Sequence, residues 1–159
     1  MIISDLQAIL SAGQVSANPS VLEHHGKDES YHRGPLPDAV VFPESCEDVV
    51  KVVKYAAERR IPLVPFGAGT GVEGHVVPVR GGICMDMSRM DRILEVRPQD
   101  FLVRVQPGVR RKKLNEYLKR YGLFFPVDPG ADATLGGMAA TNASGTTTVR
   151  YGAMRENVR

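Results

Sequence analysis

Short apolar runs rich in β-branched residues alternate with stretches of helical spacing along the chain. The short runs predict strands over residues 39–42, 63–66, 83–87, 92–96 and 101–105. The last two of these are expected to pair as a hairpin. Helical spacing predicts helices over residues 4–10, 45–60 and 110–121.

The longest predicted helix has recognisable ends. Ser45 and Asp48 resemble a capping box at its start, and Pro62 disfavours helical geometry at Ile61. Its apolar face is expected to consist of Val49, Val50, Val53, Ala56 and Ala57. The helix is long enough for a right-handed parallel crossover between its flanking strands. The loop after the second strand is then expected at the carboxyl end of the sheet, where open α/β sheets bind ligands.

The third predicted helix has a basic start. Residues 110–113 carry four positive charges at the end where the helix macrodipole is already positive. We expect these side chains to lean into solvent, with an acidic partner as the alternative. Gly122 is placed to end this helix in a left-handed conformation.

Composition excludes several classes of protein. The 159 residues are 43% apolar, which suits a compact core, and the net charge of +2 is too small to favour nucleic acid or an anionic membrane. Cys46 and Cys84 fit no metal spacing and indicate a reducing compartment. No apolar run approaches the roughly 20 residues that span a bilayer. We expect a cytoplasmic protein, with peripheral association at the inner membrane as a further option.

Residues 21–33 are polar and lack clear periodicity, so they are expected to form a surface arm. His24, His25 and His32 fall in this stretch, but no pair has the spacing of metal ligands on a helix. These three histidines and His75 are therefore expected to have surface or loop roles, and no metal site is predicted.

A glycine-rich loop follows the second predicted strand. Residues 67–74 contain four glycines, a density that favours positive φ or close approach of the backbone to a ligand. Exposed backbone N–H groups in such a loop form a concavity suited to phosphate oxygens. The alternative is a flexible hairpin loop.

The loop matches a dinucleotide pattern that its context contradicts. Gly69, Gly71 and Gly74 have the Rossmann spacing, but the third glycine of that motif should open a helix. Residues 75–82 contain a proline and two glycines and lead into a strand instead. A P-loop is excluded because no Gly-Lys-Ser/Thr follows.

Residues 128–145 consist almost entirely of small, hydroxyl and amide side chains. Thr134 is placed to cap a short helix, whose free N–H groups would favour an anion. The alternative, a disordered linker, is disfavoured because Leu135, Met138 and several alanines are too apolar for it. Two such segments predict a long, phosphate-bearing cofactor.

Motifs over most of the chain resemble the flavin-binding domain of the vanillyl-alcohol oxidase and p-cresol methylhydroxylase superfamily. They occupy residues 43–49, 65–71, 105–109 and 136–145. Further motifs are similar to the FAD-linked, cytochrome-reducing D-lactate dehydrogenases within it, at residues 27–30, 90–95, 99–101, 125–132 and 149–157.

The resemblance implies an α+β (α/β-like) fold, in which helices flank a small mixed or parallel sheet and an incomplete second subdomain follows. Residues 1–35 would be an N-terminal arm and 36–159 the FAD-binding PCMH-type domain. The residues implied to bind FAD are Pro65, Gly67, Ala68, Gly69, Thr70, Gly71, Asp128, Pro129, Gly130, Gly136, Gly137, Thr141, Asn142, Ser144 and Gly145.

By the same resemblance, flavin accepts hydride from the α-carbon of a D-2-hydroxy acid, D-lactate in particular. Electrons then pass to cytochrome c, a quinone or an electron-transfer flavoprotein, and the protein contributes orientation and electrostatics. Two alternatives stay open: a flavin subunit of glycolate oxidase, and a non-catalytic flavin- or anion-binding module.

The chain departs from the family pattern at three places. His75 stands where a glycine is common, although it lies too far along the loop to suggest covalent flavin attachment. Arg110 stands where the family usually has a threonine that caps the third helix. Relatives continue past Arg159 into a substrate domain with the catalytic histidine and a substrate-binding arginine. We therefore expect a first portion of a flavin domain, with no catalytic residue.

Overall fold

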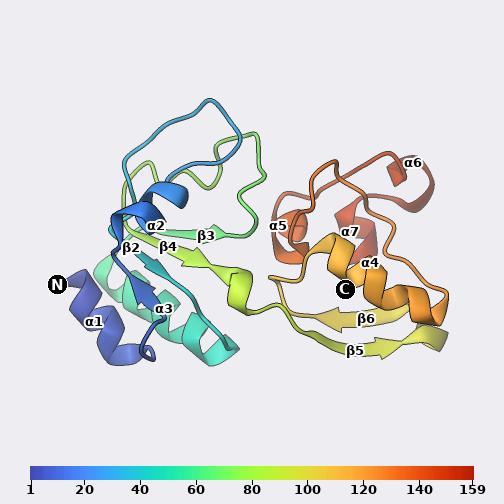
Figure 1. The fold of residues 1–159 in the computed structure, drawn as a ribbon, viewed down its shortest axis with the longest axis horizontal. Coiled ribbons are helices and arrows are strands. Elements are labelled where there is room, and N and C mark those ends of the chain that lie inside the picture. Colours follow the sequence, from blue (N-terminus) through green and yellow to red (C-terminus); the bar gives the residue numbers. More distant parts are fainter. The chain divides into compact units, whose positions relative to one another are not determined.

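The computed structural model describes residues 1–159, which divide into two compact units (Figure 1). Unit 1 comprises Met1–Arg89 and unit 2 comprises Met90–Arg159. Each unit has its own hydrophobic core.

Unit 1 is built on a four-stranded mixed sheet of order β1 (Val15–Ser16), β2 (Ala39–Val41), β4 (Ile83–Asp86), β3 (Leu63–Phe66). β4 pairs in parallel with both β2 and β3, while β1 is antiparallel to β2. The predicted parallel β2–helix–β3 unit is therefore confirmed, with β4 inserted between its two strands.

Successive residues of each strand point to opposite faces of this sheet, so alternate residues belong to two separate hydrophobic cores. One core contains Ala39, Val41, Ile83 and Met85, against which α1 (Ile2–Ile9) and α3 (Cys46–Arg59) pack. The other contains Val40, Phe66 and Cys84, together with residues of α2 (Pro19–His24). Burial of the Cys84 thiol, and then the charge of Asp86, raise its pKa to about 12, so it acts as a small apolar side chain.

Helix α3 has the predicted ends but only part of the predicted buried face. Ser45 caps it by accepting a hydrogen bond from the Asp48 N–H at 3.1 Å. Its buried residues are Val52, Tyr55 and Ala56, whereas Val50 and Val53 are 49% and 43% exposed. The prediction was correct for Ala56 and for Val49, which packs against this core, but wrong for Val50 and Val53. The helix carries two adjacent apolar stripes, and only the stripe that includes Val52 and Ala56 meets the sheet.

Unit 2 combines the predicted hairpin with four helices. The antiparallel strands β5 (Ile93–Arg97) and β6 (Leu102–Val105) are joined by a 3-10 turn at Pro98–Asp100. The helices are α4 (Arg111–Leu118), α5 (Leu135–Ala140), α6 (Thr148–Tyr151) and α7 (Met154–Asn157). The buried core residues are Val109, Leu114, Leu118, Val127, Leu135, Met138 and Met154.

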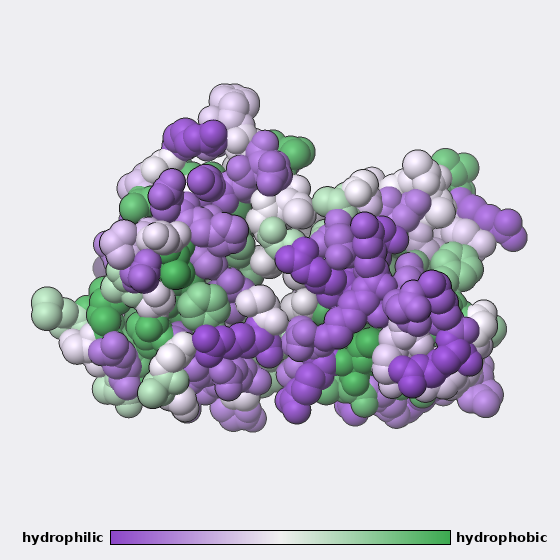
Figure 2. All heavy atoms as spheres, viewed as in Figure 1, coloured by the Kyte–Doolittle hydropathy of each residue, from purple (hydrophilic) through white to green (hydrophobic).

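Three of the four basic side chains at the start of α4 are exposed, as predicted: Arg110, Lys112 and Lys113. Arg111 is half-buried, and the Lys113 ammonium pairs with Asp91 at 2.5 Å. On the face seen in Figure 2, hydrophilic residues cover the region of unit 2 where α4 lies. Gly122 follows with φ +67°, the left-handed conformation predicted for it.

Candidate functional site

The glycine loop lies at the carboxyl end of β3, as the sequence predicts. Pro65 is still part of β3, and residues 67–71 follow as a partly exposed loop. The backbone N–H groups of Ala68, Gly69, Thr70 and Gly71 donate hydrogen bonds to no other group of the protein. An array of free amides in a glycine-rich loop fits the oxygens of a phosphate or pyrophosphate.

The packing of the loop itself requires Gly69, while Gly71 lies against an exposed side chain. Gly69 has φ +67°, and a Cβ there would lie 2.8 Å from Cζ of Phe66. A Cβ on Gly71 would lie 2.2 Å from Cε1 of the exposed His75 ring, which occupies that space. No helix lies between Gly74 and β4, so the structure also excludes a Rossmann dinucleotide-binding motif.

His25 is buried, and the surface role predicted for it is wrong. Its Nε2 lies 2.7 Å from Oδ2 of Asp86, and its Nδ1 lies 2.8 Å from the Val21 carbonyl oxygen. Both neighbours are acceptors, so each ring nitrogen is placed to donate a hydrogen bond. His25 and Asp86 are only 4% and 7% exposed, so they form a buried ion pair.

The local hydrogen bonds keep Asp86 ionised. Burial raises the pKa of this carboxyl, but hydrogen bonds from His25 and Ser88 outweigh burial and lower it. The sequence did contain a signal for this pair, because an acidic residue at the end of the apolar run 83–87 needs a buried partner.

The 128–145 segment folds as part of unit 2, so the disordered-linker alternative is excluded. Thr134 caps α5, as predicted, by accepting a hydrogen bond from the Gly137 N–H at 3.3 Å. The surface of unit 2 exposes several of the residues predicted to bind FAD, namely Gly130, Gly137, Thr141, Asn142 and Ser144.

Other residues predicted to bind FAD make contacts with neighbouring parts of unit 2. A Cβ on Gly136 would lie 2.6 Å from Cβ of Pro107, and one on Gly145 would lie 2.3 Å from the Asp128 carbonyl oxygen. Asn142 accepts a hydrogen bond from the Arg155 N–H at 2.9 Å. The glycine loop belongs to unit 1 and this segment to unit 2, and their sharing of one ligand stays a prediction.

Asp128 organises the turn that leads into α6. Its carboxylate accepts hydrogen bonds from the Thr146 hydroxyl at 2.7 Å and from the Thr147 N–H and hydroxyl at 3.0 and 2.9 Å. These bonds, that of Thr146 first, lower the pKa of Asp128 from 3.8 to about 2.

Replacing Asp128 by Asn is expected to reduce the acid sensitivity of the protein. A carboxyl whose pKa is lowered by folding stabilises the native state above its unfolded pKa, and this contribution is lost as the pH falls from about 4 towards 2. Urea unfolding of wild type and Asp128→Asn at pH 7 and pH 3 measures the difference. We expect a smaller drop for the variant between the two pH values, and equal drops would contradict the role.

The start of α4 is stabilised by a residue outside the helix. Arg110, in the N-cap position, makes no side-chain cap. Oδ1 of Asp132 instead accepts a hydrogen bond from the Lys112 N–H at 2.9 Å, and the Arg110 guanidinium donates to the Asp132 carbonyl oxygen at 3.0 Å. No local sequence pattern indicates this cap, because Asp132 lies 20 residues from Lys112.

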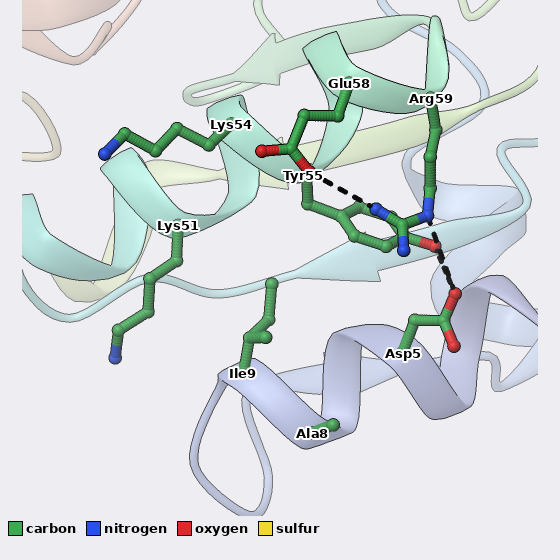
Figure 3. Close-up of a pocket in the computed structure, with 8 residues that line it drawn as sticks. All are labelled: Asp5, Ala8, Ile9, Lys51, Lys54, Tyr55, Glu58 and Arg59. Atoms are coloured by element: carbon green, nitrogen blue, oxygen red, sulfur yellow. Dashed lines mark hydrogen bonds and ion pairs between the residues drawn. The ribbon is translucent and has the colours of Figure 1, made fainter.

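A surface groove of about 420 Å³ lies between α1 and α3 in unit 1 (Figure 3). Asp5, Lys51, Lys54, Glu58 and Arg59 contribute charged side chains to it, and the Tyr55 hydroxyl donates to Asp5 at 3.0 Å. None of the residues predicted to bind FAD lines this groove, so it is not part of the candidate site.

The structure contains no group of three or more His, Cys, Asp and Glu residues arranged to hold a metal ion. None of its helices has both the length and the apolar composition needed to cross a bilayer. With no metal site, the prediction of a cofactor depends on the backbone amides of the glycine loop and on the polar surface of the 128–145 segment.

Known proteins resemble the chain over almost its whole length. A probable mitochondrial D-lactate dehydrogenase of Danio rerio is 51% identical over 157 residues, covering 99% of this chain and 32% of the relative. A D-2-hydroxyglutarate dehydrogenase of Stutzerimonas stutzeri is 34% identical, covering 97% of this chain and 34% of the relative. The chain thus spans about a third of the length of these curated relatives.

A solved structure has the same fold. Alkyldihydroxyacetonephosphate synthase superimposes with a TM-score of 0.88 and 26% identity, over 97% of this chain and 30% of the synthase chain. The family model described as "FAD binding domain" matches residues 37–159. The chain therefore belongs to the FAD-binding domain family, as the glycine loop and the motifs around it indicated.

Proposed function

We propose that this chain is the FAD-binding portion of a D-2-hydroxy-acid dehydrogenase whose preferred substrate is D-lactate. The observation that carries the proposal is the set of four free amides at residues 68–71, placed at the carboxyl end of a parallel strand. This donor set fits the pyrophosphate of FAD. The names of the relatives support the substrate class.

In this proposal the residues of the chain bind and orient the cofactor. The amides of residues 68–71 donate to pyrophosphate oxygens, and the exposed side chains of Thr141, Asn142 and Ser144 supply hydrogen bonds further along the cofactor. Asp128, Pro129, Gly130, Gly136, Gly137 and Gly145 shape that surface. When bound, FAD supplies the electron acceptor for hydride from the α-carbon of the hydroxy acid.

We assign no catalytic residue to this chain. The one buried histidine, His25, has both ring nitrogens engaged by Asp86 and by the Val21 carbonyl, so neither is free to act on a substrate. The proposed electron acceptors are cytochrome c, a quinone or an electron-transfer flavoprotein. The proposed location is the cytoplasm, at the surface of the inner membrane, and two free cysteines are compatible with a reducing compartment.

Steady-state kinetics test the proposal. They are measured on the protein expressed from its complete coding frame, which we call the complete protein. Rates with D-lactate, D-2-hydroxyglutarate and glycolate are measured with an artificial electron acceptor. We expect the highest kcat/KM for D-lactate. A higher value for glycolate would favour a glycolate oxidase, and purified protein that oxidises none of the three acids would favour a non-catalytic module.

A further inference from the structure

Residues 25–32 cross the glycine loop and bond to it at two points. Oδ2 of Asp28 accepts a hydrogen bond from the Gly74 N–H at 3.0 Å. The backbone N–H of Glu29 donates to the Gly71 carbonyl oxygen at 3.0 Å. The His32 ring also lies against Gly74, where a Cβ would be 2.7 Å from its Cδ2. We call residues 25–32 the clamp segment.

These bonds leave the proposed ligand-binding groups free. The clamp segment uses the N–H of Gly74 and the carbonyl of Gly71, and it takes none of the N–H groups of residues 68–71. It therefore fixes the far end of the loop without competing with a phosphate. A loop held in its binding conformation before the ligand arrives loses less entropy on binding.

Asp28 is held in place by its own segment. Its Oδ1 accepts a hydrogen bond from the Ser30 N–H at 2.9 Å, while Oδ2 is directed to Gly74. Burial raises the pKa of Asp28, but hydrogen bonds from Ser30 and Gly74 outweigh burial and lower it. The carboxylate is thus ionised at neutral pH and serves two backbone donors at once.

The other end of the clamp segment is anchored in the core beneath the loop. His25 pairs with Asp86, and its ring centroid lies 4.5 Å from that of Phe66. Phe66 is 2% exposed and is the side chain against which Gly69 packs. A continuous series of contacts thus joins the buried ion pair to the middle of the glycine loop.

We infer that the clamp segment sets the conformation in which the glycine loop presents its amides, with Asp28 as a positioning residue. This inference rests on the proposed FAD-binding function of the loop. It gives the 25–32 stretch, expected to be a surface arm, a role in cofactor binding without direct contact with the cofactor.

Asp28→Asn in the complete protein tests the inference, and Asp38→Asn is its matched control. The Asp38 carboxylate also accepts a hydrogen bond from a glycine N–H, that of Gly82 at 2.7 Å, but at the amino end of β4, opposite the loop. An asparagine at position 28 has one acceptor oxygen for two N–H donors. We expect FAD titrated into flavin-stripped Asp28→Asn to bind at least about tenfold more weakly. For Asp38→Asn we expect a Kd within twofold of wild type.

Hydrogen exchange of the flavin-free proteins separates positioning from general stability. We expect faster exchange in the peptide covering residues 69–75 of Asp28→Asn, with a Tm no lower than that of Asp38→Asn. Unchanged exchange in this peptide, unchanged FAD affinity, or equal loss of affinity in both variants would overturn the inference. Wild-type protein that binds no FAD would refute the proposed function, and the exchange result would then decide the inference alone.

Discussion

Replacing Gly69 by Val is expected to abolish FAD retention by the complete protein. Gly69 has φ +67°, a conformation that costs a β-branched residue about 1–3 kcal/mol. The new Cβ would also lie 2.8 Å from the Phe66 ring, which is buried against His25 and cannot move away. The loop must therefore adopt another conformation, in which the free amides of residues 68–71 no longer form one array. The flavin absorbance of the purified variant measures the loss.

Two control variants isolate the cause of this effect. Gly13 has φ +81° with no atom within 4 Å of its Cβ position, so Gly13→Val introduces the backbone strain without the clash and away from the loop. Cys46→Ser changes an exposed side chain at the start of α3. Both controls should retain flavin. A fully loaded, yellow Gly69→Val protein would disprove the assignment of the loop.

Replacing Asp86 by Ala is expected to destabilise the protein by about 3–5 kcal/mol, the usual cost of removing one partner of a buried ion pair. The His25 ring would remain buried with an unpaired Nε2. Its second bond, to the Val21 carbonyl, holds the ring in the site and prevents it from reaching solvent easily. The free energy of unfolding from urea titrations followed by circular dichroism gives the magnitude.

An exposed ion pair of unit 1 provides the comparison. Glu44 accepts a hydrogen bond from Arg89 at 2.8 Å, but both side chains are exposed, so Glu44→Ala should cost less than about 1 kcal/mol. Removing both buried partners, as in His25→Phe with Asp86→Leu, should restore much of the stability lost in Asp86→Ala. Equal losses for Glu44→Ala and Asp86→Ala would contradict the assignment of a buried, charged pair.

Local sequence signals predicted the elements that local chemistry determines. The Ser45 cap, the proline after α3, the hairpin β5–β6 and the Gly122 terminator depend on residues close together in the chain. The short elements β1, α2, α6 and α7 were missed. Helices and strands of a few residues are stabilised mainly by the surfaces on which they pack, and a propensity pattern does not show those surfaces.

The glycine loop was found from sequence, but its support was not. The loop stands out by composition and by the strand before it. Its contacts with the clamp segment join residues 46 positions apart, as from Asp28 to Gly74, and the ion pair joins residues 61 apart. Residues 21–33 show no periodic pattern from which these pairings could be predicted. Histidines in a polar stretch were therefore assigned to solvent.

Glycine density does not by itself reveal which positions of the 128–145 segment contact a ligand. Gly136 is required by the close approach of Pro107, and Gly145 by that of Asp128. A sequence shows that the backbone needs room at these positions, but it does not show whether a ligand or another segment fills the room. Binding measurements on variants of the exposed Thr141 and Ser144 are therefore more informative than glycine substitutions in this segment.

The strand order of unit 1 constrains when the protein can acquire its structure during synthesis. β2 and β3 do not pair with each other, because β4, which emerges from the ribosome after both, lies between them. A nascent chain that ends before Ile83 has two parallel strands without a shared neighbour. The last residue of β4, Asp86, is also the partner of His25. The sheet and the anchor of the clamp segment are therefore completed together, only after the whole glycine loop has been made.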